Sequence, residues 1–118
     1  MKTLVLGASP NPERYSYKAI VSLREKGYEV IAIGKKKGKV EDVEIIQEKL
    51  TFDDIDTIAM YLSPENQKEY YDYILSLKPR RIIFNPGTEN QELYKIAKEA
   101  NIEVIEWCVL VMLSLNRY

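Results

Sequence analysis

The sequence predicts an α/β fold in which helices cover both faces of a mainly parallel sheet of five or six strands. Short apolar, β-branched runs alternate along the chain with segments of helical periodicity, as in repeated βαβ units. Most runs are continuously apolar, as expected for strands covered on both faces. The 118 residues suffice for one core, so we expect a single domain over residues 1–118.

Five apolar runs are predicted to form the main strands. They cover residues 3–7, 29–33, 56–61, 81–85 and 103–106, with a short edge strand near residues 43–46. The expected architecture is therefore a Rossmann-like three-layer αβα sandwich.

Four helices are predicted between and after these strands. Ala19, Ile20 and Leu23 form the apolar stripe of the first helix, which Gly27 ends. The second helix begins at Ser63-Pro64 and ends before Pro79. The third covers residues 93–100, and the apolar segment 107–115 forms the fourth.

Composition excludes several classes of function. A net charge of -1 argues against a nucleic-acid partner, and no apolar stretch reaches the length of a membrane span. With one cysteine and no apparent secretion signal, the sequence favours a reducing, cytoplasmic location. The absence of histidine removes Ser-His-Asp and Cys-His catalysis and histidine-bound zinc, so we predict no catalytic residue and no metal site.

The loop that follows the first predicted strand is a candidate phosphate site. It reads Gly7-Ala8-Ser9-Pro10-Asn11-Pro12, and its amides and the start of the next helix are suited to hold a phosphate. Any strand-to-helix turn favours these residue types, however, and the full G-x-G-x-x-G pattern is absent. The loop alone therefore does not decide between a phosphate site and an ordinary strand-to-helix turn.

The segment that follows the second predicted strand is basic. Four lysines lie within residues 35–39, where an NAD site would place an Asp or Glu against the ribose hydroxyls. Lysines there favour a phosphorylated ribose, which both coenzyme A and NADP carry. The alternative is a solvated lysine-rich turn without a ligand.

Several motifs resemble those of the small CoA-binding domain proteins, a family similar to the CoA-binding domain of the succinyl-CoA synthetase α subunit. G-A-S-P-N-P-E-R begins at Gly7 and G-Y-E-V-I at Gly27. Asn85-Pro86-Gly87 and Cys108 give looser matches. The chain departs from the family pattern where members have N-P-K after the second strand, because it has Ile-Gly-Lys ending at Lys35.

The resemblance implies a CoA-binding module without evident catalytic machinery, with coenzyme A or an acyl-CoA as the ligand. The residues it assigns to the ligand are Gly7, Ala8, Ser9, Asn11, Tyr15, Lys35, Ser63, Asn85, Pro86 and Gly87. Two alternatives stay open: a subunit of an NADP- or other nucleotide-dependent enzyme, and an interaction protein of the same fold that binds no ligand.

The last segment raises two further expectations. Cys108 lies in an apolar stretch without a nearby base in the sequence, so we interpret it as a packing residue. The apolar run 109–113 is expected to be buried or to form a subunit contact, so a homodimer or another protein partner is a prediction of the sequence.

Overall fold

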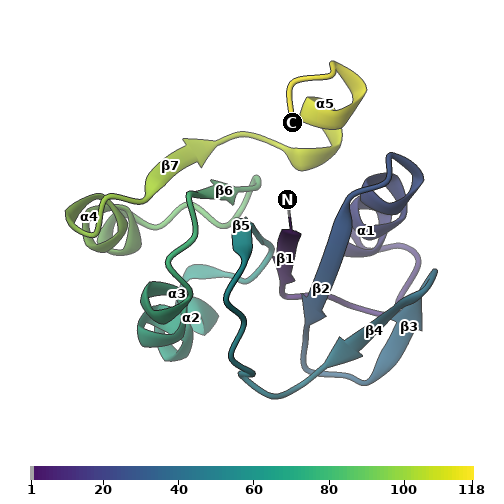
Figure 1. Ribbon diagram of the computed structural model, residues 1–118, viewed down its shortest axis with the longest axis horizontal. Helices are drawn as coiled ribbons and strands as arrows, with labels where there is room; N and C mark the ends of the chain where they lie inside the picture. Colours follow the sequence, from purple (N-terminus) through teal and green to yellow (C-terminus); the bar gives the residue numbers. More distant parts are fainter. Residues whose placement is uncertain (1) are drawn as a thin grey trace.

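The computed structural model describes residues 2–118 and contains seven strands (Figure 1). They are β1 (Lys2–Leu6), β2 (Glu29–Ile33), β3 (Gly38–Val40), β4 (Val43–Ile46), β5 (Ile55–Met60), β6 (Arg81–Phe84) and β7 (Glu103–Glu106). All belong to one sheet in the order β3-β4-β2-β1-β5-β6-β7. Every pair is parallel except β3 and β4.

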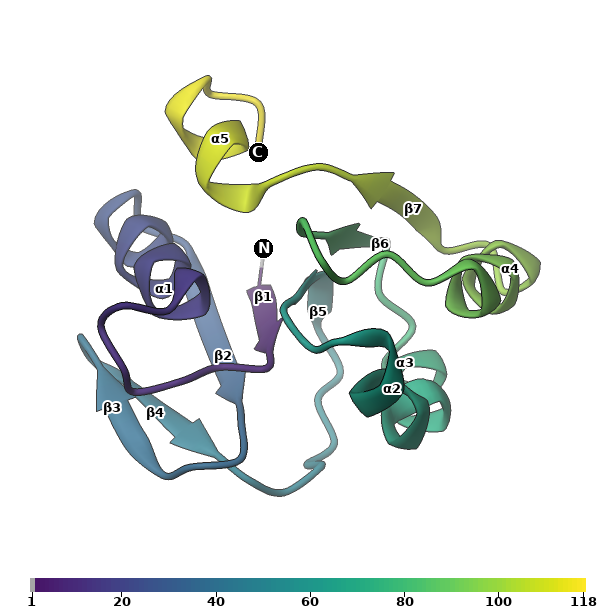
Figure 2. The same cartoon turned by 180° about the vertical axis from the view of Figure 1, so that it is seen from behind.

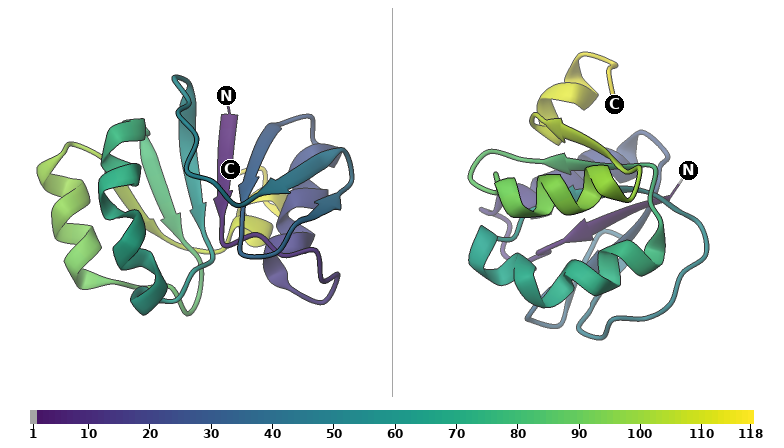
Figure 3. Two further views of the ribbon diagram at one scale, coloured as in Figure 1. Left: turned by 90° about the horizontal axis from the view of Figure 1, so that it is seen from below. Right: turned by 90° about the vertical axis from the view of Figure 1, so that its left-hand side faces the viewer.

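Helices cover both faces of the sheet, which confirms the predicted three-layer α/β architecture (Figure 3). They are α1 (Tyr15–Glu25), α2 (Pro64–Gln67), the 3-10 turn η1 (Lys68–Tyr70), α3 (Tyr71–Leu77), α4 (Gln91–Glu99) and α5 (Val109–Ser114). One layer contains α1 and α5, and the other contains α2, α3 and α4 (Figures 1 and 3). No helix within residues 2–118 is both long and apolar enough to cross a membrane.

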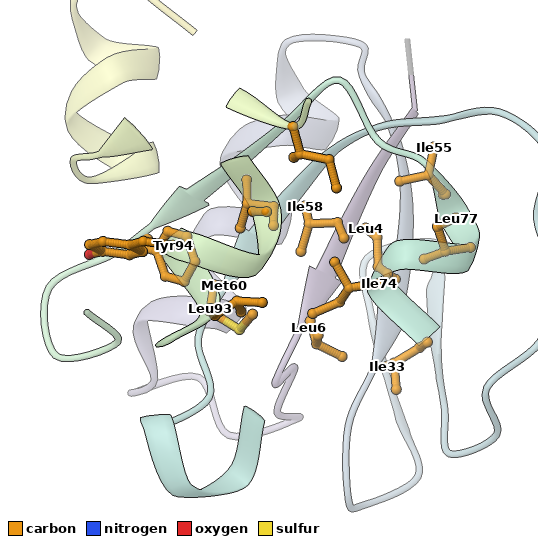
Figure 4. Packing of buried hydrophobic residues seen from close by; sticks show 14 residues of the cluster. Leu4, Leu6, Ile33, Ile55, Ile58, Met60, Ile74, Leu77, Leu93 and Tyr94 are labelled. Atoms are coloured by element: carbon orange, nitrogen blue, oxygen red, sulfur yellow. The ribbon is translucent and has the colours of Figure 1, made fainter. Parts of the chain in front are cut away.

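The core follows the alternation of side chains along the strands. Leu4 and Leu6 of β1 point to the layer of α3 and α4, where they pack with Ile74 and Leu93 (Figure 4). Val5, between them, points to the layer of α1 and α5. Each fully buried side chain of this size contributes about 1.5–3 kcal/mol to stability, so β1 ties both layers to the centre of the sheet.

The structure adds a strand that the sequence analysis missed and divides a helix that it expected to be continuous. β3 lies in the basic segment interpreted as a loop, where only Val40 is buried, and it forms by pairing with β4. The predicted helix from Ser63 to Lys78 is interrupted by η1, where the ammonium of Lys49 donates to the carbonyl of Glu69 at 2.5 Å. Both features involve backbone contacts that the pattern of apolar residues does not show.

Candidate functional site

A cleft of about 1060 Å³ lies beyond the carboxyl ends of the parallel strands. Strand order reverses at β1, which has β2 on one side and β5 on the other. Loops from both sides can therefore meet there, as ligand sites of doubly wound sheets require. The lining residues come from the loops after β1, β2, β5 and β6 and from the start of α5.

Two glycines allow the basic segment to pack directly on the loop after β1. A side-chain carbon on Gly34 would lie 2.1 Å from the carbonyl oxygen of Ala8. A side-chain carbon on Gly38 would lie 2.6 Å from the Cβ of Pro10. Figure 2 shows the chain after β1 crossing the end of β2 towards β3 before it enters α1. The contact places Lys35 in the wall of the cleft.

Two amides of the loop after β1 are already used within the fold. Gly7 and Ala8 both donate their backbone N–H to the carbonyl of Ile33 at 2.9 Å, so these two donors are used in the fold. Gly7 instead allows a close approach, because it has φ +99° and a Cβ there would lie 2.9 Å from the backbone nitrogen of Leu62. Ser9 lines the cleft and accepts the N–H of Asn11 through its hydroxyl at 3.1 Å.

The start of α1 adds further backbone donors beside that loop. Tyr15 and Ser16, the first two residues of α1, both line the cleft. Within residues 2–118 no side chain caps this helix and its first turn has no acidic residue, so its first amides remain without an intrahelical partner. These amides and the helix dipole favour an anion.

Three cationic side chains line the cleft, and no carboxylate does so within residues 2–118. They are Arg14, Lys35 and Lys36; all three are exposed and form no ion pair with another described residue. The amide of Gln47 fixes the backbone of this wall by donating to the carbonyl of Lys35 at 2.7 Å. Arg14 was missed from the sequence, although it ends the motif that begins at Gly7.

The opposite wall is held by buried polar contacts. Asn85 donates to the carbonyl of Met60 at 3.0 Å and accepts the N–H of Val109 at 2.9 Å, so its side chain is used to join β5, β6 and α5. Buried Gln67 donates to the carbonyls of Leu62 and Thr88, both of which line the cleft.

The remaining predicted site residues divide between the cleft and its surroundings. Ser63, Asn11 and Pro86 are exposed and line the cleft. Gly87 does not line it; its φ of +93° and its N–H bond to Glu89 make it a turn residue. The structure therefore brings together nine of the ten predicted residues.

The end of the cleft next to α5 is less polar than the rest. Tyr61, Cys108 and Val111 line it. Burial, with smaller contributions from Cys108 and Tyr118, raises the pKa of Tyr61 far above its usual value, so the phenol stays protonated. Cys108 is half-buried in the cleft wall.

The exposed face of α5 bears on the expected protein partner. Val109, Met112 and Leu113 are buried in the core, whereas Trp107, Val111 and Leu115 are exposed. The apolar segment thus divides into a packed face and a free one. Assembly through the free face stays a prediction.

Solved structures support the fold. The chain is 50% identical to an uncharacterized protein of known crystal structure, with a TM-score of 0.97 over 99% of this chain and 97% of that one. A Thermus thermophilus protein has 23% identity and a TM-score of 0.87, covering 99% and 90% of the two chains. A hypothetical protein from Pyrococcus horikoshii has 26% identity and a TM-score of 0.83, covering 92% and 78%.

Among curated proteins none matches the chain. The family model described as CoA binding domain matches residues 1–114, nearly the whole chain. The resemblance inferred from the motifs at Gly7 and Gly27 is therefore confirmed. This chain belongs to the CoA binding domain family.

Proposed function

We propose that the cleft binds coenzyme A and that the protein acts as a CoA-binding module. Family membership supports the ligand class. The cleft offers cationic side chains at one side, free helix amides near its centre and a less polar end beside α5. Coenzyme A carries groups that match these regions in the same order: a phosphorylated ribose, a diphosphate and a less polar pantetheine arm.

In this proposal the ligand crosses the carboxyl ends of the strands. Lys35 and Lys36 meet the 3′-phosphate, Arg14 and the start of α1 meet the diphosphate, and the pantetheine arm extends towards Tyr61. The lining residues Ser9, Asn11 and Ser63 offer polar groups along this path.

The observation that carries the proposal is the close contact between the basic segment and the first loop. Without it, lysines after β2 would be a solvated turn. Because Gly34 packs on Ala8, the lysines that follow it share a wall with the start of α1.

The 3′-phosphate provides the first test. We expect dephospho-CoA to bind roughly tenfold to a hundredfold more weakly than coenzyme A, since a charge-assisted hydrogen bond contributes about 1.5–3 kcal/mol. Isothermal titration calorimetry at two salt concentrations measures this difference, which is expected to shrink at high salt. Equal affinities for the two ligands would show that the lysines do not contact the 3′-phosphate.

The basic segment offers a matched control for the effect of reversing a lysine charge. The double variant Lys35→Glu, Lys36→Glu is expected to weaken CoA binding strongly, whereas Lys37→Glu, in the same segment but outside the cleft lining, is expected to have a small effect. If each charge reversal weakened CoA binding in proportion to the charge it changed, whether or not the residue lines the cleft, the attraction would come from the general field of the protein and not from a site.

The same titration separates the alternatives. Binding of NADPH in preference to coenzyme A would favour a nucleotide-dependent enzyme subunit. Absence of binding to either would favour an interaction protein and would contradict the proposal.

A further inference from the structure

Two hydroxyl groups of the cleft lining have no hydrogen-bond partner within residues 2–118. Ser16, at the start of α1, is only 4% exposed and lines the cleft, and its hydroxyl has no partner among the described residues. The hydroxyl of Tyr61, beside α5, is fully buried and also has no partner. Leaving a fully buried hydroxyl such as that of Tyr61 unpaired costs about 1–3 kcal/mol, whereas the Ser16 hydroxyl is open to a polar atom of a ligand in the cleft.

Cys108 lies at the same end of the cleft and is held in place by its neighbours. The residue after it donates its N–H to Asn85 at 2.9 Å. The carbonyl of Cys108 accepts the N–H of Met112 at 2.9 Å. Cys108 is half-buried and lines the cleft, while its backbone is fixed by these contacts.

Lys35 and Cys108 lie on opposite sides of β1. Lys35 follows β2 on one side, whereas Cys108 lies beside the end of β6 on the other, because the residue after it is bonded to Asn85. Coenzyme A carries its 3′-phosphate and its sulfur at opposite ends. A bound molecule whose phosphate meets Lys35 can therefore extend its sulfur towards Cys108.

We propose that Cys108 undergoes thiol–disulfide exchange with a disulfide of coenzyme A bound in the cleft. This inference rests on the proposed CoA-binding function. The Cys108 thiol loses its proton to solvent, and the thiolate attacks the CoA sulfur of the disulfide. The sulfur–sulfur bond of the ligand breaks, a Cys108–CoA disulfide forms, and the departing thiolate takes up a proton. The CoA disulfide supplies the oxidising equivalents.

The exchange is tested by comparing two disulfides on the same protein. Reduced protein is mixed with CoA disulfide or with 2-hydroxyethyl disulfide, and the gain in mass is followed by intact-protein mass spectrometry. Binding raises the effective concentration of the reacting sulfur, so we expect the CoA adduct to form at least about tenfold faster. Dithiothreitol should reverse it, and Cys108→Ser should form no adduct.

The lysine variants distinguish a directed reaction from a merely accessible thiol. Lys35→Glu with Lys36→Glu is expected to slow the reaction with CoA disulfide and to leave that with 2-hydroxyethyl disulfide unchanged. Lys37→Glu should leave both rates close to those of the unaltered protein. An accessible cysteine outside a binding site would show no such selectivity.

Failure of this inference differs from failure of the proposed function, because the affinity for reduced coenzyme A is measured separately by calorimetry. If reduced coenzyme A binds but the two disulfides react equally fast, or the CoA disulfide does not react, the exchange is refuted and the binding function stands. If reduced coenzyme A does not bind, the proposed function itself fails.

Discussion

Because Gly34 has no side chain, the basic segment can pack against the loop after β1 and form one wall of the cleft. The backbone of Gly34 lies so close to Ala8 that alanine there would force the two loops apart. We expect Gly34→Ala to reduce the stability by about 1–3 kcal/mol and to weaken CoA binding, because Lys35 would move with the loop. Urea unfolding and calorimetry measure the two effects.

Gly27→Ala is the matched control for this prediction. Gly27 has φ +83° and no atom near a built Cβ, so alanine there strains only the backbone, at a cost of about 1–2 kcal/mol. It should lower stability without changing the affinity for coenzyme A. Loss of affinity in both variants would show that binding follows global stability and not the contact of Gly34 with Ala8.

Among single residues, the sequence predicts those whose role is local. Gly7 and Lys35 follow apolar strands, and the carboxyl ends of parallel strands are where ligands bind. Ser16 and Cys108 could not be placed in the cleft from sequence, since each lies there through the packing of α1 and α5. The sequence also did not show that the N–H groups of Gly7 and Ala8 donate to Ile33 at the end of β2.

At the scale of elements, one buried side chain joins the loops after β5 and β6. Gln67 donates to Leu62 at 2.9 Å and to Thr88 at 2.8 Å, and accepts from Asn90 at 2.9 Å. We expect Gln67→Met to destabilise the protein by about 2–3 kcal/mol, since it leaves the carbonyls of Leu62 and Thr88 without this donor. The amide of Asn90 loses one acceptor but still donates to Tyr71. Thermal unfolding gives the stability, and hydrogen exchange should show faster opening around residues 62–66.

The exposed neighbour Gln91 provides the comparison for that variant. Gln91→Met changes the same side chain on the surface of α4 and should leave stability nearly unchanged. A similar small effect for both substitutions would mean that the buried contacts of Gln67 contribute little.

Elements were predictable where burial leaves a pattern in the sequence. The later residues of β1 and β5, 4–6 and 58–60, are continuously apolar because helices cover both faces of the sheet there. β3 has no such pattern, since Gly38 and Lys39 carry no buried apolar side chain and the strand exists by pairing with β4. At η1 the carbonyl of Glu69 accepts from Lys49, a contact between distant residues that the local pattern does not show.

For the whole molecule, an ion pair at the edge opposite the cleft predicts an acid dependence. Asp56 accepts two hydrogen bonds from Arg80, at 2.9 and 3.0 Å, and these, with Thr57, hold the pKa of Asp56 below its ordinary value. The charged form is thus favoured by folding, and its contribution is present above the ordinary pKa of 3.8 and lost as the pH falls through the lowered one.

Asp56→Asn should therefore reduce stability by about 1 kcal/mol at pH 7, with the difference from the unaltered protein shrinking below about pH 4. Urea unfolding across this range measures it, and CoA affinity at pH 7 serves as the control because Asp56 is not in the cleft. A difference independent of pH would assign the effect to packing instead of charge.

The junction between Asn85 and Val109 also couples the last helix to the ends of two strands. The side chain of Asn85 donates to the carbonyl of Met60 and accepts the N–H of Val109, so detachment of α5 would break a contact at the ends of β5 and β6. Local fraying of α5 would therefore loosen this wall of the cleft while the centre of the sheet stays intact.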